Sequence, residues 1–148
     1  IIIGGAIIGA MAEGRRLMSV VADTAGRRRT YTAAAFIHCP GGFESGALTI
    51  DSYGAVSETA LGLPLTGVPE PDAQFDVDYW ADHPVLRAGV AVDESQRVLD
   101  TTGTPVHENL FAAGGIIAGA SRWREKSGDG IAIASAVSAA DAAFEETA

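Results

Sequence analysis

The sequence predicts an α/β fold, and three observations point to that class. Short apolar, β-branched segments separated by glycine-containing turns fill residues 1–42, as in a set of short strands. A later segment at 109–113 is continuously apolar and ends in two glycines, which is typical of a strand buried on both faces. An alanine-rich stretch at 131–144 has the composition of a helix.

The composition is that of a globular chain with about one domain. The 148 residues are 47% hydrophobic and 20% charged, and ten Lys and Arg against nineteen Asp and Glu give a net charge of −9. This charge argues against a non-specific nucleic-acid binder and against a polybasic membrane tether. No apolar run reaches the roughly 20 residues of a membrane-spanning helix, and a single cysteine excludes an internal disulfide. We therefore expect a cytoplasmic protein.

Residues 1–42 are expected to form a β-meander that ends at a glycine turn. The predicted strands are 1–11, 17–23 and 30–39, and Pro40-Gly41-Gly42 ends the last of them. Because the chain opens inside an apolar segment and without a methionine, we also expect it to be a piece of a longer protein.

The glycines of the first strand imitate a dinucleotide-binding fingerprint. Gly4 and Gly9 stand at its first and third glycine positions, and Asp23 follows at the distance expected of a ribose-binding acid. The middle glycine is replaced by Ala6, however, and barely about two helical turns would fit before Arg16. We therefore interpret this segment as a glycine-interrupted strand.

Residues 43–84 are predicted to form a long irregular segment, with at most a short helix at 53–60. Four of the six prolines fall between positions 64 and 84, and glycines are spread through the same stretch. Loops of this length are usually functional or cover another surface. The aromatic side chains here stand among aspartates and make the segment a candidate docking surface: Phe75, Tyr79 and Trp80.

Residues 85–148 are predicted to contain a hairpin, a buried strand and the C-terminal helix. The hairpin joins 86–93 to 97–99, and the strand is 109–113. The helix at 131–144 is expected to cover the sheet with one face, which carries Ile131, Ala134, Val137 and Ser138.

Two glycine-rich stretches of this last part are candidates for binding a ligand. Gly114-Gly115 ends the buried strand, so a ligand can lie there against bare backbone. Gly128-Asp129-Gly130 opens the helix, whose first N–H groups attract anionic oxygen. The alternative is that Ser127 or Asp129 only caps the helix. The residues before this turn are basic and either hold a phosphate or carboxylate or form a solvated loop: Arg122, Arg124 and Lys126.

His38 and Cys39 are neighbours of the kind found in nucleophilic sites. Neighbours on a strand point to opposite faces, so these two cannot form a catalytic pair. We expect Cys39 to be a core thiol. No spacing of histidines and cysteines in the chain matches a metal site, so no metal ligand is predicted.

Taken together, these segments resemble the C-terminal part of the fumarate-reductase-like FAD flavoproteins. In that group a hairpin leads through Gly-x-Pro to a final strand reading Leu-(Phe/Tyr)-Ala-Ala-Gly, and an earlier strand ends in Ala-Thr-Gly-Gly-Phe. The matching segments here are 89–93, 97–100, 103–106, 109–114 and 35–43. Within the group, the chain resembles the B subunits of anaerobic glycerol-3-phosphate dehydrogenases through 42–48, 61–65, 75–90 and the tail from Leu110.

The resemblance implies the C-terminal portion of a two-domain FAD-binding fold, without the half that carries the main dinucleotide fingerprint. It implies a flavin-dependent oxidation of sn-glycerol 3-phosphate to dihydroxyacetone phosphate, with FAD or FMN as cofactor. It further implies a catalytic A-type subunit and an iron–sulfur membrane-anchor subunit as partners, which pass electrons to quinone in anaerobic respiration. We expect the complex to lie at the inner face of the cell membrane and this chain alone to be inactive.

The resemblance also implies a set of cofactor-binding residues. Gly41 and Gly42 would lie near the nucleotide side of the flavin, Gly114 and Gly115 near its ribityl chain or isoalloxazine ring, and Gly128, Asp129 and Gly130 at its pyrimidine end. The His/Arg pair of fumarate reductases is not matched here, so no catalytic residue is assigned. Two alternatives stay open: a related fumarate-reductase-like or ketosteroid-dehydrogenase-like flavoprotein, and a non-catalytic scaffold or subunit-contact domain.

Overall fold

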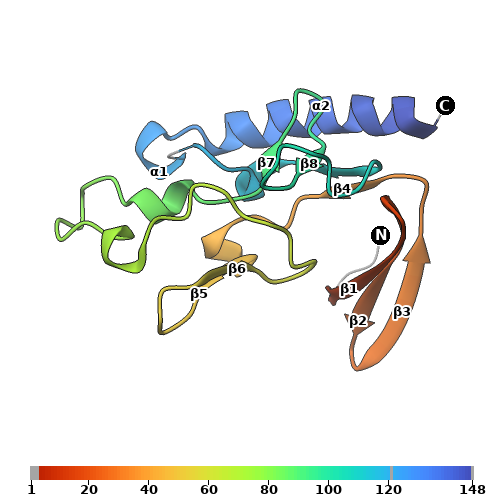
Figure 1. Cartoon of the computed structure of the whole chain (residues 1–148), viewed down its shortest axis with the longest axis horizontal. Coiled ribbons are helices and arrows are strands. Elements are labelled where there is room, and N and C mark those ends of the chain that lie inside the picture. The colour runs from red at the N-terminus through yellow and green to blue at the C-terminus, as the bar shows by residue number, and fades with distance from the viewer. Residues whose placement is uncertain (1–3, 121, 148) are drawn as a thin grey trace.

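The computed structural model describes residues 4–120 and 122–147, in which four small β-sheets accompany one long C-terminal helix (Figure 1). This helix, α2 (Gly128–Thr147), crosses one side of the molecule, and a three-stranded sheet reaches away from it near the N-terminus. The irregular middle of the chain lies at the opposite end. The predicted α/β class therefore takes the form of several small sheets and a helix.

The three-stranded sheet is the predicted meander. Its strands are β1 (Gly5–Glu13), β2 (Arg16–Thr24) and β3 (Arg27–Thr32), paired antiparallel in that order. β1 leads through a two-residue turn directly into β2, so the glycines of β1 belong to a strand and not to a dinucleotide-binding loop. Positions 1–3 of the predicted first strand lie outside the described residues.

The third predicted strand, 30–39, is wrong as a single element. β3 ends at Thr32, and a separate strand β4 (Phe36–His38) pairs in parallel with β9 (Leu110–Ala112). Between them, the carbonyl of Ala34 accepts a hydrogen bond from the side chain of Asn109 at 2.9 Å. A contact from a distant part of the chain thus accompanies the change of sheet, and no local pattern encodes it.

The middle of the chain contains a hairpin that the sequence analysis missed. β5 (Leu48–Ile50) and β6 (Val56–Glu58) pair antiparallel, so the helix expected at 53–60 is wrong. Asp51 closes the turn because its Oδ1 accepts the N–H groups of Tyr53 and Ala55 at 2.8 and 2.9 Å. Single turns of 3₁₀ helix occur at Phe43–Ser45, Pro71–Ala73, Pro84–Arg87 and Gly114–Ile116.

The hairpin predicted at 86–99 is present but shorter than expected. Its first strand, predicted over 86–93, is confined to β7 (Ala91–Val92), which pairs with β8 (Val98–Leu99). The preceding residues form the 3₁₀ turn that begins at Pro84, where the fixed φ of proline suits a first helical position.

β9 is shared by the two parts of the hydrophobic core. All three of its residues are buried, which confirms the prediction of a strand covered on both faces. Leu110 and Ala112 pack into the larger part of the core, together with Leu17 and Val98. Phe111 packs into the smaller part, which β9 forms with α2.

The predicted helix at 131–144 is confirmed within the longer α2, but its buried face differs from the expectation. Ser135, Ala139 and Ala143 are its buried residues, whereas Val137 is 58% exposed and Ala134 is also exposed. Small side chains on the inner face let the helix lie close to the strand beneath it. The larger apolar residues consequently point outward, and a pattern based on hydrophobicity selects the wrong face.

The side chain of Asn109 joins the meander to the β4–β9 pair. It is fully buried, and its Oδ1 accepts the N–H of Leu17 at 2.8 Å. Its Nδ2 donates to the carbonyls of Leu17 and Ala34 at 2.8 and 2.9 Å. The backbone carbonyl of Asn109 accepts the N–H of Phe36 at 2.9 Å. Both polar atoms of this buried carboxamide therefore link segments that are distant in the sequence.

We expect Asn109→Asp to destabilise the chain although the two side chains have the same shape. A carboxylate cannot donate to the carbonyls of Leu17 and Ala34, and unpaired buried polar groups are costly, so the free energy of unfolding in urea should fall by about 3 kcal/mol. Glu108→Gln, at the exposed neighbouring position, should change it by less than about 0.5 kcal/mol. Equal stability of the Asn109→Asp variant and the unmodified chain would contradict the bridging role.

Candidate functional site

Two glycine pairs that are far apart in the sequence meet in the structure. Gly41-Gly42 follows β4 and Gly114-Gly115 follows β9, and these two strands are parallel neighbours. The carboxyl ends of parallel strands lie at one edge of a sheet, where ligands bind in open α/β folds. A crevice of about 370 Å³ opens there, lined by Gly41, Gly42, Glu44, Ser45, Gly115, Arg122 and Gly128.

The two members of each pair have different structural roles. Gly41 has a φ of +95° and Gly114 a φ of +76°, a left-handed backbone conformation that glycine adopts without strain. Gly42 and Gly115 lie outside that region, but the guanidinium of Arg122 lies against both. A Cβ at Gly42 would be 2.7 Å from Nη2 of Arg122, and a Cβ at Gly115 would be closer still to Nη1. Backbone conformation therefore favours glycine at the first position of each pair, and a side chain at the second position would displace the guanidinium of Arg122.

Arg122 places a mostly buried positive charge in this crevice. It is the first residue of the short helix α1 (Arg122–Glu125), and its side chain is 16% exposed. Its Nη1 donates a hydrogen bond to the carbonyl of Gly115, and its Nη2 lies 3.9 Å from a carboxylate oxygen of Glu44. Arg124 and Lys126, which the sequence groups with Arg122, are exposed and do not line the crevice.

The structure brings four of the seven predicted cofactor-binding residues into the crevice: Gly41, Gly42, Gly115 and Gly128. Gly114 is held next to them, because its N–H donates to Oγ of Ser135 on α2 at 2.8 Å. Asp129 and Gly130 are exposed in the first turn of α2 and do not line the crevice. The structure thus brings the two glycine pairs together, and the cofactor-binding role of all seven residues stays a prediction.

The environments of two polar residues next to these stretches can now be described. Cys39 is exposed, so the expected core thiol is wrong. It lies on the outer face of the strand end, as Ile37 does, while His38 between them points inward. The hydroxyl of Ser127 donates to the carboxylate of Glu125 at 3.0 Å, and its backbone carbonyl accepts the N–H of Ile131 in the first turn of α2 at 2.9 Å.

The comparison with known families decides what kind of domain holds this crevice. Residues 5–131 match the FAD binding domain family. The chain belongs to that family. Two curated proteins from two strains of Halobacterium salinarum are similar to it, each described as the probable B subunit of an anaerobic glycerol-3-phosphate dehydrogenase. Each is 29% identical to the chain over 142 residues.

The match to these relatives is nearly complete for this chain and partial for them. It covers 96% of the chain and 33% of each relative, so the chain spans about a third of their length. No solved structure matches the chain significantly. The resemblance to B subunits of anaerobic glycerol-3-phosphate dehydrogenases, drawn above from the sequence, is therefore confirmed as homology.

The crevice of this FAD binding domain combines glycine backbone with a single arginine. At Gly42 and Gly115 the absence of a Cβ makes room for the guanidinium of Arg122, so a ligand in the crevice would meet this cation beside the main chain. Within residues 4–120 and 122–147, no three His, Cys, Asp or Glu side chains gather as metal ligands would. No helix in the same ranges has both the length and the hydrophobicity to cross a membrane.

A buried carboxylate that the sequence analysis missed fixes the carboxyl end of β4 next to the crevice. Glu58, the last residue of β6, is buried, and its Oε1 lies 3.2 Å from Nε2 of His38. The carboxylate also accepts the N–H groups of Ala60, Leu61 and Leu63 at 2.9, 2.7 and 3.2 Å. Burial alone raises the pKa of Glu58, but the hydrogen bonds from His38 and these N–H groups outweigh it and lower the pKa to about 2.

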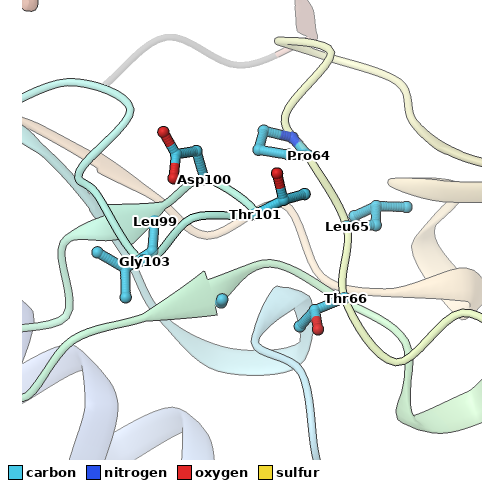
Figure 2. Close-up of a pocket in the computed structure, with 8 residues that line it drawn as sticks. Pro64, Leu65, Thr66, Leu99, Asp100, Thr101 and Gly103 are labelled. Atoms are coloured by element: carbon cyan, nitrogen blue, oxygen red, sulfur yellow. The ribbon is translucent and has the colours of Figure 1, made fainter.

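A second hollow, of about 300 Å³, lies between the middle segment and the turn that follows β8 (Figure 2). Figure 2 shows Pro64, Leu65 and Thr66 on one side and the turn at 99–103 on the other. Asp100 accepts hydrogen bonds from the hydroxyl of Thr102 and from the N–H groups of Thr104 and Thr102, which lower its pKa. The carboxylate thus stabilises its own turn, and none of the residues that line this hollow is basic.

The lowered pKa of Glu58 makes part of the stability depend on pH. The folded pKa of about 2 lies below the ordinary value of 4.5, so the carboxylate stabilises the fold above pH 4.5 and this contribution is lost as the pH falls towards 2. The free energy of unfolding in urea, measured from neutral pH down to about pH 3, should decline in that window.

Glu58→Gln isolates this contribution. The variant should be less stable at neutral pH by about 2 kcal/mol, because its amide cannot accept all the hydrogen bonds of the carboxylate. Its stability should also decline less steeply in acid. Glu70→Gln removes an exposed carboxylate and should leave the curve unchanged. A Glu58→Gln curve parallel to that of the unmodified chain would show that another group causes the acid sensitivity.

Proposed function

We propose that the chain is the cofactor-binding C-terminal portion of a flavin-dependent dehydrogenase, of the type of the glycerol-3-phosphate dehydrogenase B subunits. The reaction would be the oxidation of sn-glycerol 3-phosphate to dihydroxyacetone phosphate. The observation that carries this proposal is the meeting of Gly41-Gly42 with Gly114-Gly115 at the ends of two parallel strands. Membership of the FAD binding domain family and homology to B subunits support the same function.

In this proposal, the residues in and next to the crevice bind different parts of the cofactor. Gly41 and Gly42 lie towards its nucleotide side, Gly114 and Gly115 against the ribityl chain or isoalloxazine ring, and Gly128 at its pyrimidine end. Asp129 and Gly130 act there only through the first turn of α2, since they do not line the crevice. Bound flavin supplies the two-electron acceptor that the oxidation of an alcohol requires. FAD is favoured over FMN by the family to which the chain belongs.

The names of the relatives suggest the setting of this function. A protein described as a B subunit is part of a complex of several subunits. We propose that the polypeptide of this chain associates with a catalytic A-type subunit and with an iron–sulfur membrane-anchor subunit that passes electrons to quinone. The complex then works at the inner, cytoplasmic face of the cell membrane in anaerobic glycerol metabolism.

A second candidate function is a subunit contact without catalysis, and one observation favours it. The middle segment exposes large aromatic side chains, with Phe75 at 56%, Tyr79 at 76% and Trp80 at 74% of their full area. Exposed aromatic residues are enriched at protein–protein interfaces. This segment lies at the end of the molecule away from the meander (Figure 1). Flavin binding distinguishes the two candidate functions, because a domain that only contacts another subunit is not expected to bind flavin.

The purified chain should bind FAD, seen as a change in the visible absorption of added flavin, and Gly115→Ala should weaken the binding about tenfold or more. The new methyl group would meet the guanidinium of Arg122 and the backbone of Gly41. Gly9→Ala is the matched control, because Gly9 lies in β1 with open space around its Cβ position. Equal flavin affinity of the Gly115→Ala variant and the unmodified chain would contradict binding at the proposed crevice. FMN, titrated in parallel, should bind more weakly than FAD.

Turnover tests the reaction itself. The full-length polypeptide in its complex should reduce an artificial electron acceptor when sn-glycerol 3-phosphate is added, and this chain alone should not. Two alternative substrates should give no reaction with the complex: fumarate, offered with a reduced artificial electron donor, and a 3-ketosteroid, offered with the electron acceptor. Activity with either of them and none with sn-glycerol 3-phosphate would identify a related flavoprotein instead.

A further inference from the structure

The guanidinium of Arg122 is the most distinctive charged group of the crevice. It lies against both Gly42 and Gly115, and its side chain is only 16% exposed. A cation removed from water to this extent is costly unless opposite charge and hydrogen-bond acceptors surround it. The manner in which Arg122 is paired therefore indicates what the crevice is built to hold.

The pairing of Arg122 within the protein is incomplete. Among the described residues, its partners are the carbonyl of Gly115, which accepts a hydrogen bond from Nη1, and the carboxylate of Glu44. The separation of 3.9 Å between Nη2 and Glu44 is too long for a hydrogen bond. Glu44 is also 76% exposed, and such exposed ion pairs contribute little. A guanidinium has five N–H donors, so most of its capacity is unused by these two partners.

We propose that Arg122 is the residue with which the glycine crevice recognises phosphate oxygens of its ligand, and that the ligand displaces Glu44 from it. The planar fork of a guanidinium binds a phosphate through two parallel hydrogen bonds. The exposed carboxylate of Glu44 holds the cation loosely until a stronger anion arrives. This inference rests on the ligand crevice proposed above, but not on which flavin or substrate occupies it.

The glycine pairs allow the guanidinium of Arg122 to lie directly against the main chain. Any side chain at Gly42 or Gly115 would push the guanidinium away from the crevice floor. The carbonyl of Gly115 then fixes one nitrogen of the guanidinium, while the side chain of Arg122 lines the crevice. In a chain with a net charge of −9, a cation held this way provides a local site for an anion.

The test compares Arg122→Gln, Arg122→Lys and Glu44→Gln with the unmodified chain, using inorganic phosphate in calorimetric titrations. Arg122→Gln should weaken phosphate binding about tenfold or more, because a charged hydrogen-bonded contact is lost. The phosphate affinity of Arg122→Lys should lie between those of Arg122→Gln and the unmodified chain, since lysine keeps the charge without the planar fork. Glu44→Gln should strengthen binding about two- to threefold by removing the competing carboxylate. If Arg122 had only a structural role, Arg122→Gln and Glu44→Gln would not be expected to change phosphate affinity in opposite directions.

Arg124→Gln is the control, because Arg124 is an exposed cation on the same short helix. It should leave phosphate binding unchanged, and thermal unfolding monitored by circular dichroism should show that all four variants fold. Three results would overturn the inference: no phosphate binding by the unmodified chain, equal binding by Arg122→Gln, or an equal loss in Arg124→Gln.

The source of the phosphate is distinguished by titrating FAD and riboflavin into the same variants. If the phosphate belongs to the cofactor, Arg122→Gln weakens binding of FAD but not of riboflavin. If it belongs to the substrate, FAD binding is unchanged, and binding of sn-glycerol 3-phosphate to the FAD-loaded chain is weakened instead. A chain that binds phosphate through Arg122 but binds no flavin would refute the proposed function and leave this inference standing.

Discussion

The buried carboxamide of Asn109 is the contact on which the arrangement of the strands depends. It accepts and donates hydrogen bonds at Leu17 of β2 and donates to Ala34, just before β4 begins, while its own carbonyl takes the N–H of Phe36. These bonds place the start of β4 beside β9 and set the register in which Phe36 faces Leu110. A shifted β4 would cost this buried carboxamide its hydrogen bond to the carbonyl of Ala34.

The other end of β4 is fixed by a second buried polar contact. A three-residue strand contributes little stability alone, and its carboxyl end would fray without further support. His38, its last residue, meets the Glu58 carboxylate, which also holds the turn after β6 through three backbone N–H groups. The short strand is thus held at its amino end through Asn109 and at its carboxyl end through Glu58. The glycine turn at Gly41-Gly42 therefore follows a strand that is held at both ends.

The sequence predicted those features that local patterns encode. The meander, the doubly buried β9, the C-terminal helix and both glycine pairs follow from turn residues, apolar runs and alanine content. Two features that depend on distant partners were missed: β4 as a strand of another sheet, and the buried Glu58. The β5–β6 hairpin was also missed, although Asp51 closes its turn locally. The face of α2 was missed for a different reason, because close packing against Phe111 selects Ala139 and Ala143 over the larger apolar residues. Arg122 was noticed as one of three basic residues, but only the fold separates it from Arg124 and Lys126.

The chain contains a third glycine pair, and the contrast with it shows what turns such a pair into a candidate site. Gly4-Gly5 precedes and enters β1, an edge strand of an antiparallel meander, where Gly5 pairs with Thr24 at the end of β2. Gly41-Gly42 and Gly114-Gly115 contain the same dipeptide but follow parallel neighbours, so Gly41, Gly42 and Gly115 line one crevice. A Cβ at Gly4 would meet nothing within 4 Å, whereas one at Gly42 or Gly115 would collide with Arg122. The dipeptide supplies freedom of conformation in all three places, and the neighbouring parallel strand makes two of them parts of one surface.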